Sequence, residues 1–334
     1  MSTFNRTTVK RLALSLGIVV LATSCGDDTK QAQPASPASV ASVVPAATEA
    51  PLATEPVGPV SVQAANGTVT LDTMPMKIVS LSPTHTEMLF AIGAGSQVIA
   101  VDDQSNFPAE AEKVKSALSG LTPNIEAIAG YKPDLVVMAD DYNGLVDQLT
   151  ALKISVWSGS AATSLDDVYA QIEQLGVLTG HAADAVKVSS QMSDDVAKIV
   201  ASLPKLAKPL SFYHELDDTY FSSTSNTFIG AIYAMAGLVN IADTAEAGND
   251  YPQLSAEFIV SASPDLIFLA DTKCCAQNAD TVATRDGWAA IAAVKNGHVI
   301  SMDDDISSRW GPRIVDYLQA VADAVNAAAV APVG

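Results

Sequence analysis

One pattern occurs twice in this sequence of 334 residues, and the repetition constrains the fold more than any other feature. Residues 126–140 read EAIAGYKPDLVVMAD, and residues 257–271 read EFIVSASPDLIFLAD. The two copies share the spacing of Glu, Ile, Pro-Asp and the apolar run before the last Asp. Two copies of one folding unit predict two related lobes with a cleft between them. Ligands of open α/β sheets bind beyond the carboxyl ends of the strands, so residues that follow each strand should face that cleft.

Short apolar runs alternate with helical patterns on both sides of a long helical segment at residues 165–203. Apolar runs of this length, separated by helices, are typical of parallel strands covered on both faces. The expected strands lie in KIVSLS, VIAVDD, DLVVMAD and ISVWSG before that segment and in PLSFYHEL, DLIFLAD and HVISMDD after it. The sequence therefore predicts the α/β class, with two α/β units joined by helix.

The N-terminus has the features of a secretory signal peptide at residues 1–24. Three basic residues precede an apolar run from Leu12 to Leu21, which is too short to span a bilayer as a helix. Small residues before Cys25 resemble the lipobox of bacterial lipoproteins, in which the cysteine is lipidated after cleavage. We therefore expect an extracytoplasmic protein anchored to the cell membrane through Cys25, although an ordinary cleaved signal is the alternative.

Residues 25–75 are expected to be a tether, because their first part is rich in Pro, Ala, Ser and Thr and lacks periodicity. The folded part is predicted to begin at Met76. After cleavage, 15 basic residues face 37 acidic residues, a net charge of −22. Such a surface offers no basic stripe that could neutralise phosphates, so we expect no nucleic-acid partner.

Four stretches resemble one family: IVSLSPTHTEMLFAIGAG, NIEAIAGYKPDLVV, YPQLSAEFIVSASPDLIFL and RWGPRIVDYL, in this order. The family is that of the substrate-binding proteins of ABC importers for cobalamin, ferric siderophores and haem. The resemblance implies two Rossmann-like lobes, at residues 76–181 and 204–330, bridged by one rigid helix at residues 182–203. It also implies that a chelate containing cobalt or iron is delivered to a permease dimer with ATPase subunits. No resident cofactor or metal and no catalytic step are expected.

Glu126 and Glu257 begin the two copies of the repeated pattern. A negative charge in the first turn of a helix is favoured by the helix dipole, by about 0.3–1 kcal/mol, and this explains either residue alone. It does not explain an equivalent glutamate in each lobe. The family resemblance implies that the pair docks onto arginines of a two-fold symmetric permease dimer, since guanidinium groups bind carboxylates in a fixed orientation.

Motif matching places the ligand-binding residues after the strands of both lobes. They are Pro83, Thr84, Gln104, His214, Glu215, Tyr251, Asp305 and Arg309. Tyr251 lies where the cobalamin binders of the family have an aromatic residue, and an aromatic ring packs well on a flat macrocycle. Gln104 and Gly120 stand where those binders carry aromatic side chains, so either the ligand differs or residues such as Tyr142 and Trp310 supply the contacts.

A corrinoid is the favoured ligand, because a rigid macrocycle suits a cleft that changes little and an anionic ferric catecholate would be repelled by the acidic chain. A ferric siderophore or haem is the alternative. A receptor for a free ion would require metal ligands such as His85, His214 and Glu215 to converge. Hydrogen bonding at the strand ends is the other interpretation of these residues.

A metal-dependent extracellular enzyme is the alternative of another class. His85-Thr-Glu87 looks like the start of a zinc deaminase motif, but Cys274-Cys275 lacks the Pro-Cys-x-x-Cys spacing that the motif requires. In an oxidising compartment these two cysteines have each other as intramolecular partners when Cys25 is lipidated. They are expected to form either a vicinal disulfide or two free thiols.

Overall fold

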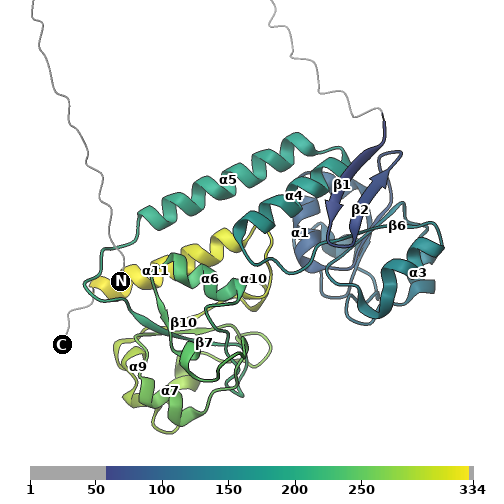
Figure 1. Cartoon of the computed structure of the whole chain (residues 1–334). Coiled ribbons are helices and arrows are strands. Elements are labelled where there is room, and N and C mark those ends of the chain that lie inside the picture. The colour runs from purple at the N-terminus through teal and green to yellow at the C-terminus, as the bar shows by residue number, and fades with distance from the viewer. Residues whose placement is uncertain (1–57, 331–334) are drawn as a thin grey trace, which may run out of the picture. The chain divides into compact units, whose positions relative to one another are not determined.

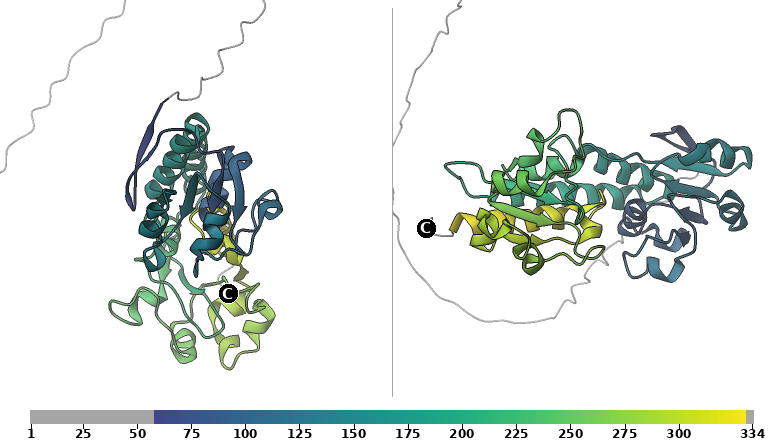
Figure 2. Two further views of the ribbon diagram at one scale, coloured as in Figure 1. Left: turned by 90° about the vertical axis from the view of Figure 1, so that its right-hand side faces the viewer. Right: turned by 90° about the horizontal axis from the view of Figure 1, so that it is seen from below.

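The computed structural model describes residues 58–330, so the predicted signal peptide, Cys25 and most of the predicted tether lie outside the described residues. The folded part begins earlier than expected. An antiparallel hairpin, formed by β1 (Val60–Ala64) and β2 (Gly67–Leu71), occupies part of the segment assigned to the tether. β1 packs against α4 (Leu165–Thr179), as Figure 2 shows. The Asn66 side chain bonds to the backbone of residues 156 and 158 on the sheet edge. The prediction that residues up to 75 are all tether is therefore wrong.

The N-terminal lobe is built on a parallel sheet in the order β4-β3-β5-β6. Its strands are β3 (Ile78–Ser80), β4 (Val98–Val101), β5 (Leu135–Met138) and β6 (Ser155–Ser158). The central strands β3 and β5 are buried on both faces, as their continuous apolar runs predict. The helices of this lobe are α1 (Pro83–Ala91), α2 (Ile125–Gly130) and α3 (Leu145–Ala151).

The C-terminal lobe repeats that topology with the sheet order β8-β7-β9-β10. The strands are β7 (Ser211–Glu215), β8 (Val239–Asn240), β9 (Leu266–Leu269) and β10 (Val299–Ser301). The helices are α6 (Phe228–Met235), α7 (Ala256–Ala262), α8 (Ala279–Ala283), α9 (Ala292–Asn296), α10 (Asp304–Ser307) and α11 (Ile314–Val330). In each lobe the first strand in sequence lies between the second and the third. The predicted α/β fold with two related lobes is confirmed.

The Pro-Asp pair of the repeated pattern has the same structural role in both lobes. The Asp134 carboxylate accepts hydrogen bonds from the backbone N–H groups of Met76 and Lys77, just before β3. The Asp265 carboxylate accepts hydrogen bonds from the N–H and hydroxyl of Ser211, at the start of β7. Each aspartate thus fixes the start of the first strand of its lobe beside the third strand.

A long helix joins the lobes, at the position expected for the bridge. This helix, α5 (Ala182–Ala201), follows α4 after a turn at Gly180, whose φ of 78° suits a residue without a Cβ. α4 begins at a capping box between Ser164 and Asp167. α5 packs against α4 and against α11 (Figure 1), and α11 was not expected as a partner of the bridge. None of the helices within residues 58–330 is both long enough and apolar enough to cross a bilayer.

Candidate functional site

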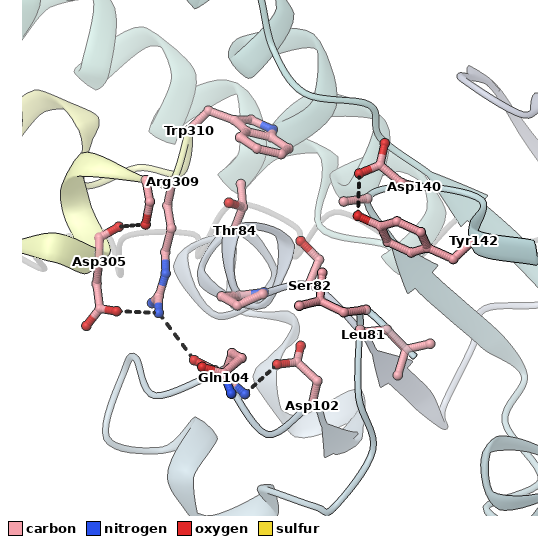
Figure 3. Close-up of a pocket in the computed structure, with 15 residues that line it drawn as sticks. Leu81, Ser82, Thr84, Asp102, Gln104, Asp140, Tyr142, Asp305, Arg309 and Trp310 are labelled. Atoms are coloured by element: carbon pink, nitrogen blue, oxygen red, sulfur yellow. Dashed lines mark hydrogen bonds and ion pairs between the residues drawn. The ribbon is translucent and has the colours of Figure 1, made fainter. Parts of the chain in front are cut away.

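Two pockets meet at the segment that follows β10. The first pocket, with a volume of about 330 Å³, lies at the carboxyl ends of β3, β4 and β5 (Figure 3). It is lined by Leu81, Ser82, Pro83, Thr84, Asp102, Gln104, Gly120, Leu121, Ala139, Asp140, Tyr142, Asp305, Ser308, Arg309 and Trp310. Residues from both lobes therefore form its wall, as the position of the predicted cleft requires.

The second pocket, of about 270 Å³, lies on the side of the C-terminal lobe. Its wall includes residues 161–163, 226–229, Asp250, Tyr251, Ile314 and Tyr317. Residues 308–310 line both pockets, and we call them the central segment. A ligand large enough to fill both pockets would therefore contact the central segment on both of its sides.

Trp310 is held in place by a glutamine that also binds a buried histidine. Gln171 Oε1 accepts a hydrogen bond from Trp310 Nε1 at 3.0 Å and lies 3.0 Å from His85 Nε2. The edge-on ring of His85 lies between Trp157 and Trp310, with centroids 4.9 and 5.9 Å away. Burial lowers the pKa of His85 to about 4, so the imidazole is neutral at physiological pH and positions Trp310 through Gln171.

Arg309 crosses from the C-terminal lobe to the N-terminal lobe. Its guanidinium donates to Glu87 Oε1 at 2.9 Å, to Asn106 Oδ1 at 2.9 Å, to the Gln104 carbonyl at 3.2 Å and to Asp305 Oδ1 at 2.8 Å. Glu87, on α1, also accepts two hydrogen bonds from Arg313, at 2.5 and 2.9 Å. This carboxylate was not among the predicted site residues, and it is buried between two arginines of the other lobe.

Most of the predicted ligand residues lie at these pockets. Pro83, Thr84, Gln104 and Asp305 line the first pocket, Tyr251 lines the second, and Arg309 lines both. Tyr251 is 51% exposed, so its ring is available for contact. Two alternatives from the sequence, Tyr142 and Trp310, also line the first pocket.

His214 and Glu215 are not at the pockets, and their assignment as cleft residues is corrected. Both are fully buried on β7. His214 Nδ1 lies 2.9 Å from the hydroxyl of Tyr233, and burial lowers the pKa of His214 to about 3. Glu215 forms a bidentate ion pair with Arg285, with both distances 2.6 Å. A residue at the carboxyl end of a strand can reach the ligand only if its side chain does not point into the core.

The histidines do not converge on one metal site either. His85 lies in the N-terminal lobe with Ser82 and Gln171 as its partners, and His214 lies in the core of the C-terminal lobe. Within residues 58–330, no group of three or more His, Cys, Asp or Glu side chains is arranged to hold a metal ion. His85 and His214 instead form hydrogen bonds within the protein, as the other interpretation of these residues expects.

Gly120 shows why this chain departs from the aromatic residues that the family pattern places there. A Cβ atom at Gly120 would collide with the carbonyl oxygen of Leu81. An aromatic side chain at this position would therefore require the backbone of the pocket wall to move. Tyr142 and Trp310 face the same pocket, so aromatic surface is supplied from other elements (Figure 3).

Glu126 and Glu257 occupy equivalent positions in the two lobes. Each lies in the first turn of a helix, α2 or α7, and is exposed. The caps match as well, since Asn124 accepts from Ala127 N and Ser255 accepts from Phe258 N. No side chain within residues 58–330 forms an ion pair with either glutamate. Both carboxylates therefore stay accessible.

Cys274 and Cys275 are both free, so the expectation of a vicinal disulfide is corrected in favour of its alternative. Neighbouring Cα atoms are about 3.8 Å apart across a trans peptide, which is shorter than the usual ~4.4–6.8 Å of a disulfide. The backbone N–H of Cys274 donates to Asp304, and that bond fixes the loop without a covalent bridge.

Comparisons with known proteins agree with this geometry. The model of a family described as periplasmic binding protein matches residues 78–306. The chain is 32% identical to a cobalamin-binding protein of Halobacterium salinarum, over 79% of this chain and 73% of the relative. It is 30% identical to an ABC transporter substrate-binding lipoprotein of Bacillus subtilis, over 80% and 86%. The crystal structure of the vitamin B12-binding protein BtuF of Vibrio cholerae has a TM-score of 0.64 at 25% identity, covering 77% of this chain and 99% of that one.

Proposed function

This chain belongs to the periplasmic binding protein family, and we propose that it is the substrate-binding lipoprotein of an ABC importer that captures a corrinoid between its lobes. The observation that carries the proposal is the pair of pockets on either side of the central segment. Aromatic residues stand on both sides, with Tyr142 and Trp310 at the first pocket and Tyr251 at the second. Aromatic faces and many polar groups suit a flat macrocycle with an amide-rich rim. The names of the relatives from Halobacterium and Vibrio support the same ligand class.

Haem is the second candidate, because three tyrosines, Tyr142, Tyr251 and Tyr317, line the pockets and a tyrosine can bind haem iron. Burial and the neighbouring Asp140 raise the pKa of Tyr142, which disfavours the phenolate that would bind iron. Tyr317 is buried and donates its hydroxyl to Tyr233, so Tyr251 is the remaining axial ligand of this kind at the described pockets. The geometry therefore supports a corrinoid more strongly than haem.

Titration calorimetry of the purified protein with cyanocobalamin, ferrichrome and hemin tests the ligand class. We expect saturable heat with cyanocobalamin at a dissociation constant of about 1 μM or tighter. Saturation with ferrichrome or hemin and no heat with cyanocobalamin would contradict the corrinoid proposal.

The contribution of Tyr251 can be measured in the same assay. We expect Tyr251→Ala to weaken cyanocobalamin binding by about 1–3 kcal/mol, because the ring surface that would be buried against the ligand is lost. Tyr131→Ala is the matched control, since Tyr131 is also exposed but lines neither pocket. Equal affinity of the Tyr251 variant and the wild type would remove Tyr251 from the site.

We also propose that Cys25 carries a lipid that anchors the protein outside the cytoplasm. Cys25→Ser should move the protein from the membrane fraction to the soluble fraction, because the thiol is the acceptor of the lipid. The variant should still bind the ligand, since the pockets lie within residues 81–317. Retention of the Cys25→Ser protein in the membrane fraction would refute the anchor.

A further inference from the structure

Arg309 is the one cationic residue among the described residues that line the two pockets. Its side chain is 9% exposed and takes part in four hydrogen bonds, with Glu87, Asn106, the Gln104 carbonyl and Asp305. A guanidinium has five N–H donors, so one donor is left for a ligand. Most of the hydrogen-bond donors of Arg309 are therefore already used by groups of the protein.

The cationic side chains around the central segment are all paired with carboxylates of the protein. Arg309 and Arg313 share Glu87, while Lys273 pairs with Asp303 and Asp305. The carboxylates of Asp102 and Asp140 at the first pocket and Asp250 at the second add negative charge. An anionic group entering either pocket would meet a carboxylate surplus and no free guanidinium.

Glu87 lines neither pocket, but it fixes the positions of Arg309 and Arg313. Its side chain is 2% exposed, and it accepts bonds from both arginines at once. We propose that Glu87 is a specificity-determining residue, which excludes anionic chelates by occupying the guanidinium groups of Arg309 and Arg313. Glu87 acts through the arginines and is a positioning residue. The inference rests in part on the proposed function, since it describes which chelates the same cleft admits.

The test compares Glu87→Gln with the wild type using two corrinoids that differ in one charge. The probes are cyanocobalamin and its monocarboxylic acid, in which one peripheral amide is replaced by a carboxylate. We expect the preference for the neutral corrinoid to fall by about tenfold or more in Glu87→Gln, because a freed guanidinium can form a charge-assisted bond with the added carboxylate. An unchanged preference in a folded variant would overturn the proposal.

Two controls separate charge pairing from net charge and from folding. Asp147→Asn removes one exposed carboxylate that lines neither pocket and should leave the preference unchanged. Glu87→Gln combined with Arg313→Gln removes one negative and one positive charge, so the net charge of the network does not change. This double variant should therefore fold even if Glu87→Gln alone is destabilised by an arginine without a partner. This double variant should still lose preference for the neutral corrinoid, because Arg309 lacks Glu87, and a preference equal to that of the wild type would contradict the proposal.

A second probe makes the result independent of the corrinoid. Citrate, a small trianion, should raise the melting temperature of Glu87→Gln, or of the double variant, more than that of the wild type or Asp147→Asn. A wild type that binds no corrinoid would refute the proposed function, while the citrate comparison would still decide the role of Glu87. Equal citrate shifts in all four proteins would overturn it.

Discussion

We expect the double variant Glu126→Arg/Glu257→Arg to bind its ligand as the wild type does and to fail in uptake. The two glutamates are exposed, unpaired within the described residues and equivalent in the two lobes. Neither lines a pocket of the candidate site, so the ligand affinity should not change. Arginines facing the proposed arginine pockets of the permease would replace attraction by repulsion, which costs several kcal/mol and corresponds to roughly a 100-fold loss of uptake or more.

The measurement is uptake of labelled cyanocobalamin by cells in which the variant replaces the wild type. Asp184→Arg/Asp316→Arg is the matched control, because both aspartates are exposed and lie in the first turns of α5 and α11. It reverses the same number of charges and should preserve uptake. If the glutamate variant took up ligand normally, or the control failed equally, the proposed docking role of the glutamates would be wrong.

The sequence predicted the fold well where structure depends on local pattern. The repeated segments at 126–140 and 257–271 form a helix followed by the third strand of each sheet. Their aspartates explain part of the repetition, since Asp134 and Asp265 fix the start of the neighbouring strand. The repeated glutamates have no comparable contact within the described residues, and their docking onto a partner stays a prediction.

The hairpin was missed although a local signal for it exists. Asn66-Gly67 lies between two runs of alternating side chains, and this pair is a strong indicator of a tight turn. Gly67 has a φ of 104°, which a residue with a Cβ rarely adopts. The hairpin was assigned to the tether because the segment before it is rich in Pro and Ala.

The site could be predicted only in part, because its key contacts join residues far apart in sequence. The rule that ligands bind after parallel strands located Pro83, Thr84 and Gln104, but it could not identify which strand-end residues face the core. Glu87 is 222 residues from Arg309, and no local pattern reveals that pair. A lone acid in the apolar stretch around α1 was the one sign that a buried charge needed a partner.

The other large effect concerns the buried pair of Glu215 and Arg285 in the core of the C-terminal lobe. We expect Arg285→Met to lower the free energy of unfolding by about 3–5 kcal/mol near pH 8, because Glu215 would remain buried and charged without its partner. The side chains of Trp288 and Tyr220 also contact the guanidinium, at 4.5 and 5.4 Å from the ring centroids. The long Met side chain keeps part of that packing.

The loss should depend on pH, because a second buried carboxyl lies beside this pair. Burial, together with the charge of Glu215, raises the pKa of Asp271 to about 8, while Arg285 opposes the shift. A carboxyl whose pKa is raised on folding contributes stability that is complete below its unfolded pKa, near 4, and is lost as the pH rises through about 8. Without Arg285, Asp271 should hold its proton more tightly, so the difference between variant and wild type should grow from pH 5 to pH 8.

Urea unfolding at pH 5, 6.5 and 8 measures this difference, with Lys295→Met as the control. Lys295 is an exposed cation in the same lobe, so its replacement removes the same charge without uncovering a buried carboxylate. We expect the control to change stability by about 0.5 kcal/mol or less at every pH. A loss in Arg285→Met that is the same at all three pH values would mean that Arg285 stabilises the lobe by packing on Trp288 rather than by compensating Glu215 and Asp271.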